Sequence, residues 1–403
     1  MKMADLQPHK LVNLRSQLQT PTLMRIDINL PFENGYIAQD AMRLQVYAHD
    51  LELCSQYAGL VVTAHQGRKG DEDFSDLRPH YKRLFKMLPD NVEIVFVPYG
   101  KVFTEETKQM IGNLKPKQII LLDNVRYFDH EKKFDPDASP YIPFFKGVIK
   151  TCVNDAIPAW HRADSSLMCL PYIARTYVGM RSYYELGIIE RITESKASKA
   201  LISGGRKLQK VTDLQKIYKS GIEGFTGGAI AQAILRASGH DLGIENNRFL
   251  ERIFSAEEFE DAKLIAFMGV RNPVDFKVVE NGETRNISLE DMHKSRGMIM
   301  DIGDGTVDKY SEDLQAKEIR IRAGPLGVYE KGFKNGIELT RRIAGDGLVF
   351  LGGDTSQEVV ENGLDQHIIS TGGQILISGG SALHRLAGGD FPSINLILEM
   401  YGR

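Results

Sequence analysis

The sequence has few cysteines, little net charge and no long apolar run. Its three cysteines, Cys54, Cys152 and Cys169, are odd in number and widely spaced, which argues against a disulfide framework and a zinc knuckle. The net charge of −3 gives no electrostatic reason to expect nucleic acid as a partner. No apolar stretch reaches the roughly 18 residues of a membrane helix, and the N-terminus carries no secretory signal pattern. We therefore expect a cytoplasmic protein that binds neither nucleic acid nor membranes.

The remaining composition is typical of an α/β protein with two domains. The chain has 403 residues, of which 42% are hydrophobic and 26% charged, enough for more than one core. Short apolar runs alternate with longer amphipathic stretches, which predicts two Rossmann-like domains with mostly parallel sheets. The predicted strands are 23–28, 60–64, 94–97, 119–122, 148–153, 200–202, 264–268, 298–302, 319–321, 348–351, 367–369 and 375–377.

Other segments complete this outline. Apolar residues at helical spacing predict a helix over 40–56 and an inter-domain helix over 172–192. Asn281-Gly282 predicts a hairpin over 278–286. The domains would then span 1–171 and 193–390, and the pattern alone indicates no role for the tail 391–403.

The two halves end their predicted strands with different residues. All six Gly-Gly pairs follow residue 200, at 204–205, 227–228, 352–353, 372–373, 379–380 and 388–389. In the first half the strands are followed by cations, amides and a carboxylate: Arg25, Asp27, Asn29, His65, Arg68, Asn124, Arg126, Asn154, His161 and Arg162. Ligands of open parallel sheets bind beyond the carboxyl ends of the strands. We therefore expect a small, strongly anionic ligand in the first half and a ligand that needs close backbone approach in the second.

The cationic residues have two interpretations. A single arginine is more often a surface residue in a weak ion pair. Several arginines after different strands favour bidentate binding of carboxylate or phosphate. The set comprises Arg25, Arg43, His65, Arg68, Arg126, His161 and Arg162.

The glycine-rich half also allows two interpretations. Glycines followed by helix N-termini can cradle phosphates, but they also simply end strands and cap helices. Asp354 and Thr355 suit Mg²⁺ with phosphate oxygens, and they equally suit the start of a helix. Lys207 and Lys210 could reach phosphates or lie in solvent. Neither G-x-G-x-x-G nor a P-loop occurs, which disfavours a nicotinamide-dependent dehydrogenase.

Eight motifs follow one another along nearly the whole chain. The first half contains RIDINLP (25–31), AHQGR (64–68), LDNVR (122–126) and VNDA (153–156) with His161-Arg162. The second half contains Gly204-Gly205, TGG (226–228), GPLGVYE (324–330) and GGDT (352–355). In this order they resemble the motifs of phosphoglycerate kinases, and the forms AHQGR and TGG resemble the archaeal branch.

This resemblance implies a two-domain hinge enzyme that moves a phosphoryl group reversibly between ATP and the carboxylate of 3-phosphoglycerate. The products would be ADP and 1,3-bisphosphoglycerate, in glycolysis or gluconeogenesis. It implies that phosphoglycerate is held by Asp27, Asn29, Arg43, His65, Arg68, Arg126 and Arg162. It implies that the nucleotide is held by Gly204, Gly205, Lys207, Gly227, Gly228, Gly324, Pro325, Glu330, Gly353, Asp354 and Thr355, with Asp354 on Mg²⁺. It also implies that 391–403 returns to the first domain, in a monomer or homodimer.

The implied chemistry needs no enzymic base, because the substrate carboxylate is already ionised at neutral pH. It needs neutralisation of the phosphoryl charge and exclusion of water. Domain closure would bring Arg43 and Lys207 together, and helix amides at Gly379 and Gly380 would add to them.

Three departures from the family motifs lie in the second half. Ala323 stands where the family has asparagine, and the spacing leaves the role of Lys210 open. The loops 370–373 and 378–381 stand where the family has one, and we favour Gly379-Gly380. These departures motivate the alternative of a catalytically weak relative that binds phosphoglycerate or nucleotide as a sensor.

Overall fold

The chain forms two compact units, each built around its own parallel sheet. The computed structural model describes residues 3–30, 32–33, 36–37, 42–206, 211–352 and 354–402, without the side chains of 32, 33, 36, 37, 211, 354 and 355. Unit 1 is Met1–Arg191 with Gly389–Arg403, and unit 2 is Ile192–Gly388. Within the described residues, no helix is long and apolar enough to cross a membrane.

Unit 1 contains a six-stranded sheet in which every neighbouring pair is parallel. Its strand order is β5 (Glu93–Val97), β6 (Gln118–Leu122), β4 (Leu60–Thr63), β1 (Thr22–Ile26), β7 (Thr151–Asp155) and β8 (Thr176–Val178). A short antiparallel pair, β2 (Phe32–Glu33) and β3 (Tyr36–Ile37), follows β1.

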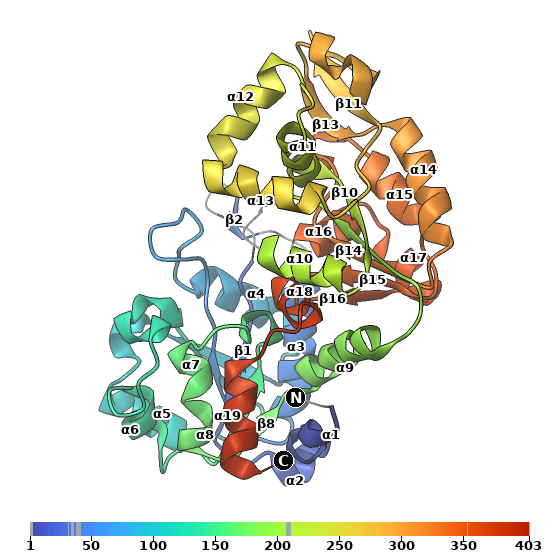
Figure 1. The fold of residues 1–403 in the computed structure, drawn as a ribbon. Coiled ribbons are helices and arrows are strands. Elements are labelled where there is room, and N and C mark those ends of the chain that lie inside the picture. Colours follow the sequence, from blue (N-terminus) through green and yellow to red (C-terminus); the bar gives the residue numbers. More distant parts are fainter. Residues whose placement is uncertain are drawn as a thin grey trace. The chain divides into compact units, whose positions relative to one another are not determined.

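Helices cover both faces of this sheet (Figure 1). One face carries α3 (Met42–Ser55) and α4 (Arg78–Met87), and the other carries α5 (Glu105–Gly112), α6 (Tyr141–Phe145) and α8 (Leu170–Ile173). The neighbouring strands β1 and β7 are thus followed by helices on opposite faces. In open α/β sheets this reversal leaves room for a ligand at the carboxyl ends of the strands.

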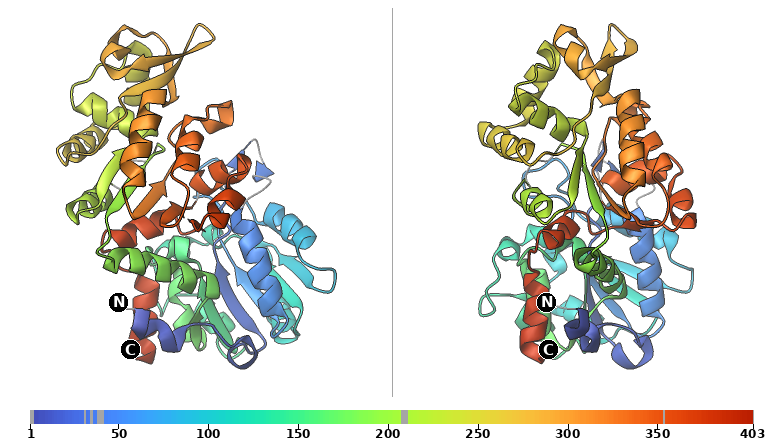
Figure 2. Two further views of the ribbon diagram at one scale, coloured as in Figure 1. Left: turned by 90° about the vertical axis from the view of Figure 1, so that its right-hand side faces the viewer. Right: turned by 45° about the vertical axis from the view of Figure 1, so that its right-hand side comes forward.

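The C-terminal segment belongs to unit 1. Helix α19 (Pro392–Tyr401) packs on α8 and on α7 (Ser165–Met168), close to the N-terminal helices α1 (Met3–Leu6) and α2 (Leu14–Gln17) (Figure 2). Ser393 Oγ accepts a hydrogen bond of 3.1 Å from the Asn154 amide. The ring of Phe391 meets the buried ring of Trp160 edge-on, with centroids 5.5 Å apart. These contacts tie the last helix to the loop after β7.

Unit 2 has a parallel sheet and a smaller antiparallel one (Figure 2). The parallel sheet runs β10 (Glu223–Thr226), β9 (Lys199–Ser203), β14 (Ile319–Ala323), β15 (Leu348–Leu351) and β16 (Gln374–Leu376). The antiparallel sheet runs β12 (Glu283–Ser288), β11 (Asp275–Glu280) and β13 (Met298–Ile302). The helices are α10 (Val211–Lys219), α11 (Gly228–Ala237), α12 (Ile244–Ile253), α13 (Ala256–Ala266), α14 (Asp304–Gln315), α15 (Asn335–Arg342), α16 (Asp354–Glu361), α17 (Asp365–Ser370) and α18 (Gly380–Leu386).

The predicted α/β class with mostly parallel sheets is confirmed, and three local predictions need correction. The strands predicted at 264–268 and 367–369 lie at the end of α13 and inside α17. A short apolar run does not distinguish a strand from a helix turn, and Leu264, Phe267 and Ile369 are exposed in these helices. The strand predicted at 298–302 is confirmed as β13, which pairs antiparallel with β11. The helix predicted over 172–192 covers only Met180–Glu194 (α9), because β8 occupies part of the segment before it.

Asp50, on α3, is a buried carboxylate in unit 1. Its Oδ2 atom has no hydrogen-bond partner among the described residues. Burial and the charge of the neighbouring Asp155 together raise the pKa of Asp50 to about 7, although the charge of Arg181 lowers it. The native state therefore holds a proton that the unfolded chain releases near pH 4.

The natural protein is expected to lose stability as pH rises, because Asp50 loses its proton in the native state. Asp50→Asn should abolish this loss, since asparagine does not ionise. Because the native pKa lies above the unfolded one, the stabilising proton is fully held at low pH and is lost as pH rises toward 7. Relative to the natural protein, the variant should gain about 2 kcal/mol in free energy of unfolding between about pH 5.5 and about pH 8. Urea titrations at both pH values measure this, with the exposed Asp90→Asn as control. Parallel pH profiles for the natural protein and Asp50→Asn would contradict it.

Candidate functional site

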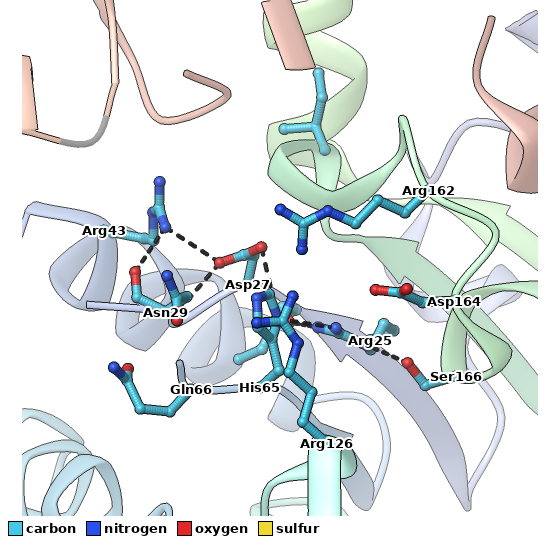
Figure 3. Close-up of polar contacts among 12 residues, drawn as sticks. Arg25, Asp27, Asn29, Arg43, His65, Gln66, Arg126, Arg162, Asp164 and Ser166 are labelled. Atoms are coloured by element: carbon cyan, nitrogen blue, oxygen red, sulfur yellow. Dashed lines mark hydrogen bonds and ion pairs between the residues drawn. The ribbon is translucent and has the colours of Figure 1, made fainter. Parts of the chain in front are cut away.

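A cluster of cationic side chains lies at the carboxyl ends of four neighbouring strands of unit 1 (Figure 3). Arg25 comes from the end of β1, His65 follows β4, Arg126 follows β6 and Arg162 follows β7. Because these strands are parallel neighbours, residues far apart in sequence meet at one edge of the sheet. We call this group, together with Asp27, Asn29 and Arg43, the cationic cluster.

Arg25 is buried and fully engaged at the base of the cluster. Its Nε atom donates to Ser166 Oγ over 2.9 Å, and Nη1 donates to the carbonyl oxygen of Ile26. Its Nη2 atom lies 3.1 Å from Nδ1 of His65. A guanidinium can only donate hydrogen bonds, so Nδ1 of His65 must accept this one. Arg25 therefore fixes the orientation of the His65 ring through its hydrogen bond to Nδ1.

His65 is neutral in this environment. Burial lowers the pKa of His65 well below its usual range, and the charges of Arg126 and Arg25 lower it further. Since Nδ1 accepts from Arg25, the single ring proton is on Nε2. His65 can thus offer one neutral N–H donor to an anion.

Arg126 has buried hydrogen-bond donors that lack a partner among the described residues. Its Nη1 atom donates to the carbonyl oxygen of Gly67, but Nε and Nη2 are buried without a partner among the described residues. Burial lowers the pKa of Arg126 to about 10, with a further contribution from the charge of Arg162. Nη1 of Arg162 is also buried and without a partner in the part of the chain described. Buried donors of this kind match the oxygens of a carboxylate or phosphate.

Arg43 lies at the opposite side of the cluster and reaches it from α3. Its Nη1 atom donates to Asp27 Oδ1 over 3.2 Å and to the carbonyl oxygen of Asn29 over 2.6 Å. Asn29 Oδ1 accepts from the backbone N–H of Gly67 over 2.7 Å. Asp27 and Asn29 therefore hold Arg43 and connect the loops after β1 and β4.

Arg68 is the one predicted phosphoglycerate-binding residue that the structure does not bring into the cluster. It is exposed on the loop after β4, with no side-chain hydrogen bond or ion pair to the other cluster members among the described residues. The other six predicted residues lie together: Asp27, Asn29, Arg43, His65, Arg126 and Arg162.

Sequence reasoning missed a second layer of polar residues beneath the cluster. Glu131 is buried and accepts from Ser166 Oγ over 2.7 Å, from Ser166 N over 3.0 Å and from the Tyr141 hydroxyl over 3.4 Å. Burial and the charge of Asp164 together raise the pKa of Glu131 to about 7, although the charge of Arg25 lowers it. Neither Glu131 nor Ser166 follows a strand or carries a motif, so only the folded topology reveals them.

In unit 2, glycine-rich loops after β9, β10 and β14 pack backbone against backbone. A Cβ on Gly204 would lie 2.3 Å from the carbonyl oxygen of Pro325, and Gly324 has a φ of +87°. The Gly205 N–H donates to the Pro325 carbonyl over 2.6 Å, and the Gly228 N–H donates to the Leu326 carbonyl over 2.9 Å. A side chain at Gly204 or Gly324 would force these loops apart. The glycines therefore form a close-packed platform at the carboxyl edge of the sheet.

A buried ion pair supports this platform. The Arg322 Nη2 atom donates to both carboxylate oxygens of Glu358 at 2.9 Å, and Nη1 donates to the carbonyl oxygen of Gly324. Burial raises the pKa of Glu358 to about 7, which the charge of Arg322 opposes. The pair links β14 to α16 and fixes the start of the loop that carries Pro325.

The two candidate phosphate loops lie at opposite edges of the sheet. Gly379, with a φ of +51°, precedes α18 and follows β16, so it lies at the carboxyl edge. Gly373 precedes β16, and its N–H is already bonded to the Ile368 carbonyl over 2.8 Å. This placement favours Gly379-Gly380 over Gly372-Gly373 as the loop near a ligand.

The other predicted nucleotide residues are only partly visible. Asp354 is the first residue of α16, directly after the carboxyl end of β15, and Gly227 precedes α11. Glu330 is exposed in the short helical turn Tyr329–Lys331. Lys207, Lys210 and Gly353 lie outside the described residues, as do the side chains of Asp354 and Thr355. Within the described part, no group of three or more His, Cys, Asp or Glu residues could hold a metal ion.

Comparisons with known proteins agree on one family. The family model described as phosphoglycerate kinase matches residues 17–388. The chain is 29% identical over 396 residues to the phosphoglycerate kinase of Methanopyrus kandleri, covering 93% of this chain and 94% of that protein. It is 30% identical over 402 residues to that of Pyrococcus abyssi, covering 94% of each. The crystal structure of the Pyrococcus horikoshii OT3 phosphoglycerate kinase superposes with a TM-score of 0.85 at 26% identity, covering 98% of this chain and 99% of that one.

A cationic cluster in one α/β unit and a glycine platform in the other are typical of a phosphotransferase with small anionic substrates. The match over residues 17–388 makes this specific: the chain belongs to the phosphoglycerate kinase family. The family predicted from the motifs is thereby confirmed, and many of its curated relatives are archaeal. The relatives named above are all phosphoglycerate kinases, and none of them favours the sensor alternative.

Proposed function

We propose that the cationic cluster of unit 1 holds 3-phosphoglycerate while unit 2 holds the nucleotide. The observation that carries this proposal is a pair of buried donors of Arg126, Nε and Nη2, which lack a partner among the described residues, as does Nη1 of Arg162. Buried donors without a partner lower the stability of the folded state, and an anion that accepts their hydrogen bonds would remove this cost. A phosphate and a carboxylate on one small molecule provide enough oxygen acceptors for both arginines.

The nucleotide would lie on the glycine platform, with its phosphates toward the helices that begin after β15 and β16. The close backbone packing at Gly204 and Gly324 supports close approach of a planar ligand, and Gly379 precedes a helix whose amides face the carboxyl edge. Glu330, Lys207 and Thr355 would provide polar contacts at its edges.

The position of Asp354 fits a role in holding Mg²⁺. It is a carboxylate at the first residue of α16, immediately beyond the strand end where the phosphates would lie. When bound with ATP, Mg²⁺ neutralises charge on the phosphate oxygens. Asp354 would position the metal–nucleotide complex, and the phosphates would supply further oxygen ligands.

Transfer would proceed by direct attack of the substrate carboxylate on the terminal phosphoryl group, with ADP leaving. Arg126, Arg162 and His65 would orient the phosphoglycerate, so that its carboxylate faces the nucleotide after the two units close. Arg43 and Lys207 would stabilise the charge of the transferring group, together with amides near Gly379 and Gly380. Closure would also exclude water, which otherwise hydrolyses ATP.

The direct test measures ADP release from MgATP with and without 3-phosphoglycerate, coupled so that the acyl phosphate cannot accumulate. We expect turnover that depends on 3-phosphoglycerate. Binding of 3-phosphoglycerate without turnover would contradict the proposal and would support the alternative of a sensor. A role in glycolysis or gluconeogenesis supports a cytoplasmic location, and a monomer or homodimer remains our expectation.

Asp354→Ala is expected to weaken binding of MgADP at least about tenfold while leaving 3-phosphoglycerate binding unchanged, since one metal-linked carboxylate is removed. Calorimetric titration of each ligand measures both affinities. The matched control is Asp365→Ala, which removes the aspartate at the first position of α17, another helix of unit 2. Equal MgADP affinity in Asp354→Ala and the natural protein would contradict the role of Asp354.

A further inference from the structure

A continuous hydrogen-bonded chain runs from a buried carboxylate to the ring of His65. Glu131 Oε1 accepts from the Ser166 hydroxyl over 2.7 Å, and Ser166 Oγ accepts from Arg25 Nε over 2.9 Å. Arg25 Nη2 then meets His65 Nδ1 at 3.1 Å. Glu131, Ser166, Arg25 and His65 are all at most 3% exposed, so water does not compete for these bonds.

With Glu131 ionised, donors and acceptors along this chain permit only one arrangement of protons. The Ser166 hydroxyl has one proton, which it gives to Glu131, so its oxygen is free to accept from Arg25. The backbone N–H of Ser166 also donates to Glu131, over 3.0 Å, which fixes the carboxylate on both sides. Arg25 cannot accept, and His65 must therefore present a lone pair at Nδ1 and a proton at Nε2.

Other groups around His65 do not supply this control. The nearest carboxylate oxygen recorded for it, Asp27 Oδ2, lies 3.9 Å from Nδ1, too far for a hydrogen bond. The remaining charges that act on the ring, those of Arg126, Arg162 and Lys132, are all positive. They disfavour a second ring proton but do not select which nitrogen carries the first.

We propose that Glu131 is a positioning residue which, through Ser166 and Arg25, holds His65 in the tautomer with its proton on Nε2. The inference rests on the proposed function, because the ligand that receives this proton is the anionic substrate of the cationic cluster. In this arrangement His65 binds an oxygen of that substrate as a neutral donor. The arginines provide positive charge for the substrate, and the Nε2–H group of His65 orients one of its oxygens.

The test combines two readouts on Ser166→Ala, which removes the middle of the chain without touching the substrate. The first readout is the tautomer of His65 in the ligand-free protein, from the ¹⁵N shifts of its two ring nitrogens, assigned with His65→Asn. The second is the ratio of KM for 3-phosphoglycerate to KM for MgATP. The control is Ser165→Ala, which removes the neighbouring buried hydroxyl on α7, a donor to the His130 carbonyl outside the chain.

We expect the natural protein and Ser165→Ala to show the Nε2–H tautomer, and Ser166→Ala to show a mixture of both tautomers. KM for 3-phosphoglycerate should rise roughly tenfold in Ser166→Ala, as for a lost charge-assisted hydrogen bond, with KM for MgATP within about twofold of the natural value. Glu131→Gln keeps the volume of the side chain and should shift the tautomer in the same direction, which guards against a poorly folded Ser166→Ala.

An unchanged tautomer in both folded variants would overturn the inference. Failure of the proposed function is a separate result, namely absence of 3-phosphoglycerate-dependent turnover in the natural protein. The tautomer measurement is made without substrate, so it still decides the role of the chain in that case.

Discussion

Arg126→Met is expected to give a protein that is more stable than the natural one and nearly inactive. The substitution removes a buried charge whose Nε and Nη2 donors have no partner in the described part of the chain, at the loss of one hydrogen bond to Gly67. Replacing a buried guanidinium with two unpaired donors by an apolar side chain of similar length should raise the free energy of unfolding by about 1–2 kcal/mol. In the proposed function, the substrate oxygens accept hydrogen bonds from these same donors. We therefore expect kcat/KM for 3-phosphoglycerate to fall by about 10³.

Urea denaturation of the ligand-free protein and steady-state kinetics measure the two effects on one sample. The control is Arg15→Met, on an exposed position of α2, which should change neither quantity. Binding of MgADP should be the same in all three proteins, since Arg126 belongs to unit 1. A variant that loses stability and keeps its dependence on 3-phosphoglycerate would show that Arg126 is a structural residue.

The same residue shows how far sequence reasoning reaches at this site. Arg126, His65 and Arg162 were predicted to meet because each follows a different apolar strand, and neighbouring parallel strands bring their carboxyl ends together. The register of the strands alone accounts for this convergence. Arg68 has the same sequence signature and is nevertheless exposed on the loop after β4, next to Gly67, whose φ is +64°.

Residues beneath the cluster could not be found in this way. Glu131 lies in a short helical turn and Ser166 in a four-residue helix, and no spacing links them to Arg25, which is 141 positions from Ser166. Buried polar networks of this kind depend on contacts between loops, which local sequence patterns do not encode. The burial of Glu131 becomes visible only in the folded chain.

The wrong strand predictions have a simpler physical cause. The run at 264–268 is the last turn of α13, and an upstream signal identifies that helix: Ser255 and Glu258 form a reciprocal capping box. Leu264 and Phe267 are exposed, and a short apolar run occurs both in strands and in helix turns, so the start of the helix is the better indicator. The absence of any pattern for β10, which contains Gly224, has a related cause, because glycine carries no side chain to reveal burial.

Arg43→Ala is expected to lower kcat by about 10²–10³ without changing the affinity for MgATP, because one positive charge near the transferring phosphoryl group is lost. The Nη1 atom of Arg43 donates to Asp27 and to the carbonyl oxygen of Asn29, both in unit 1. Arg43→Ala also leaves the buried carboxylate of Asp27 without this ion pair. Arg43→Lys is therefore the companion variant, since it keeps a charge near Asp27 and should recover part of kcat.

Stopped-flow measurement of phosphoryl transfer and calorimetry with MgATP separate the two quantities. Gln45→Ala, an exposed position on the same helix, is the control for disturbance of α3. If affinity for MgATP fell as far as kcat in Arg43→Ala, the residue would act on nucleotide binding and its assignment to the phosphoryl group would be wrong. If Arg43→Lys matched Arg43→Ala in kcat, a point charge would be insufficient, and the planar guanidinium itself would be required for transfer.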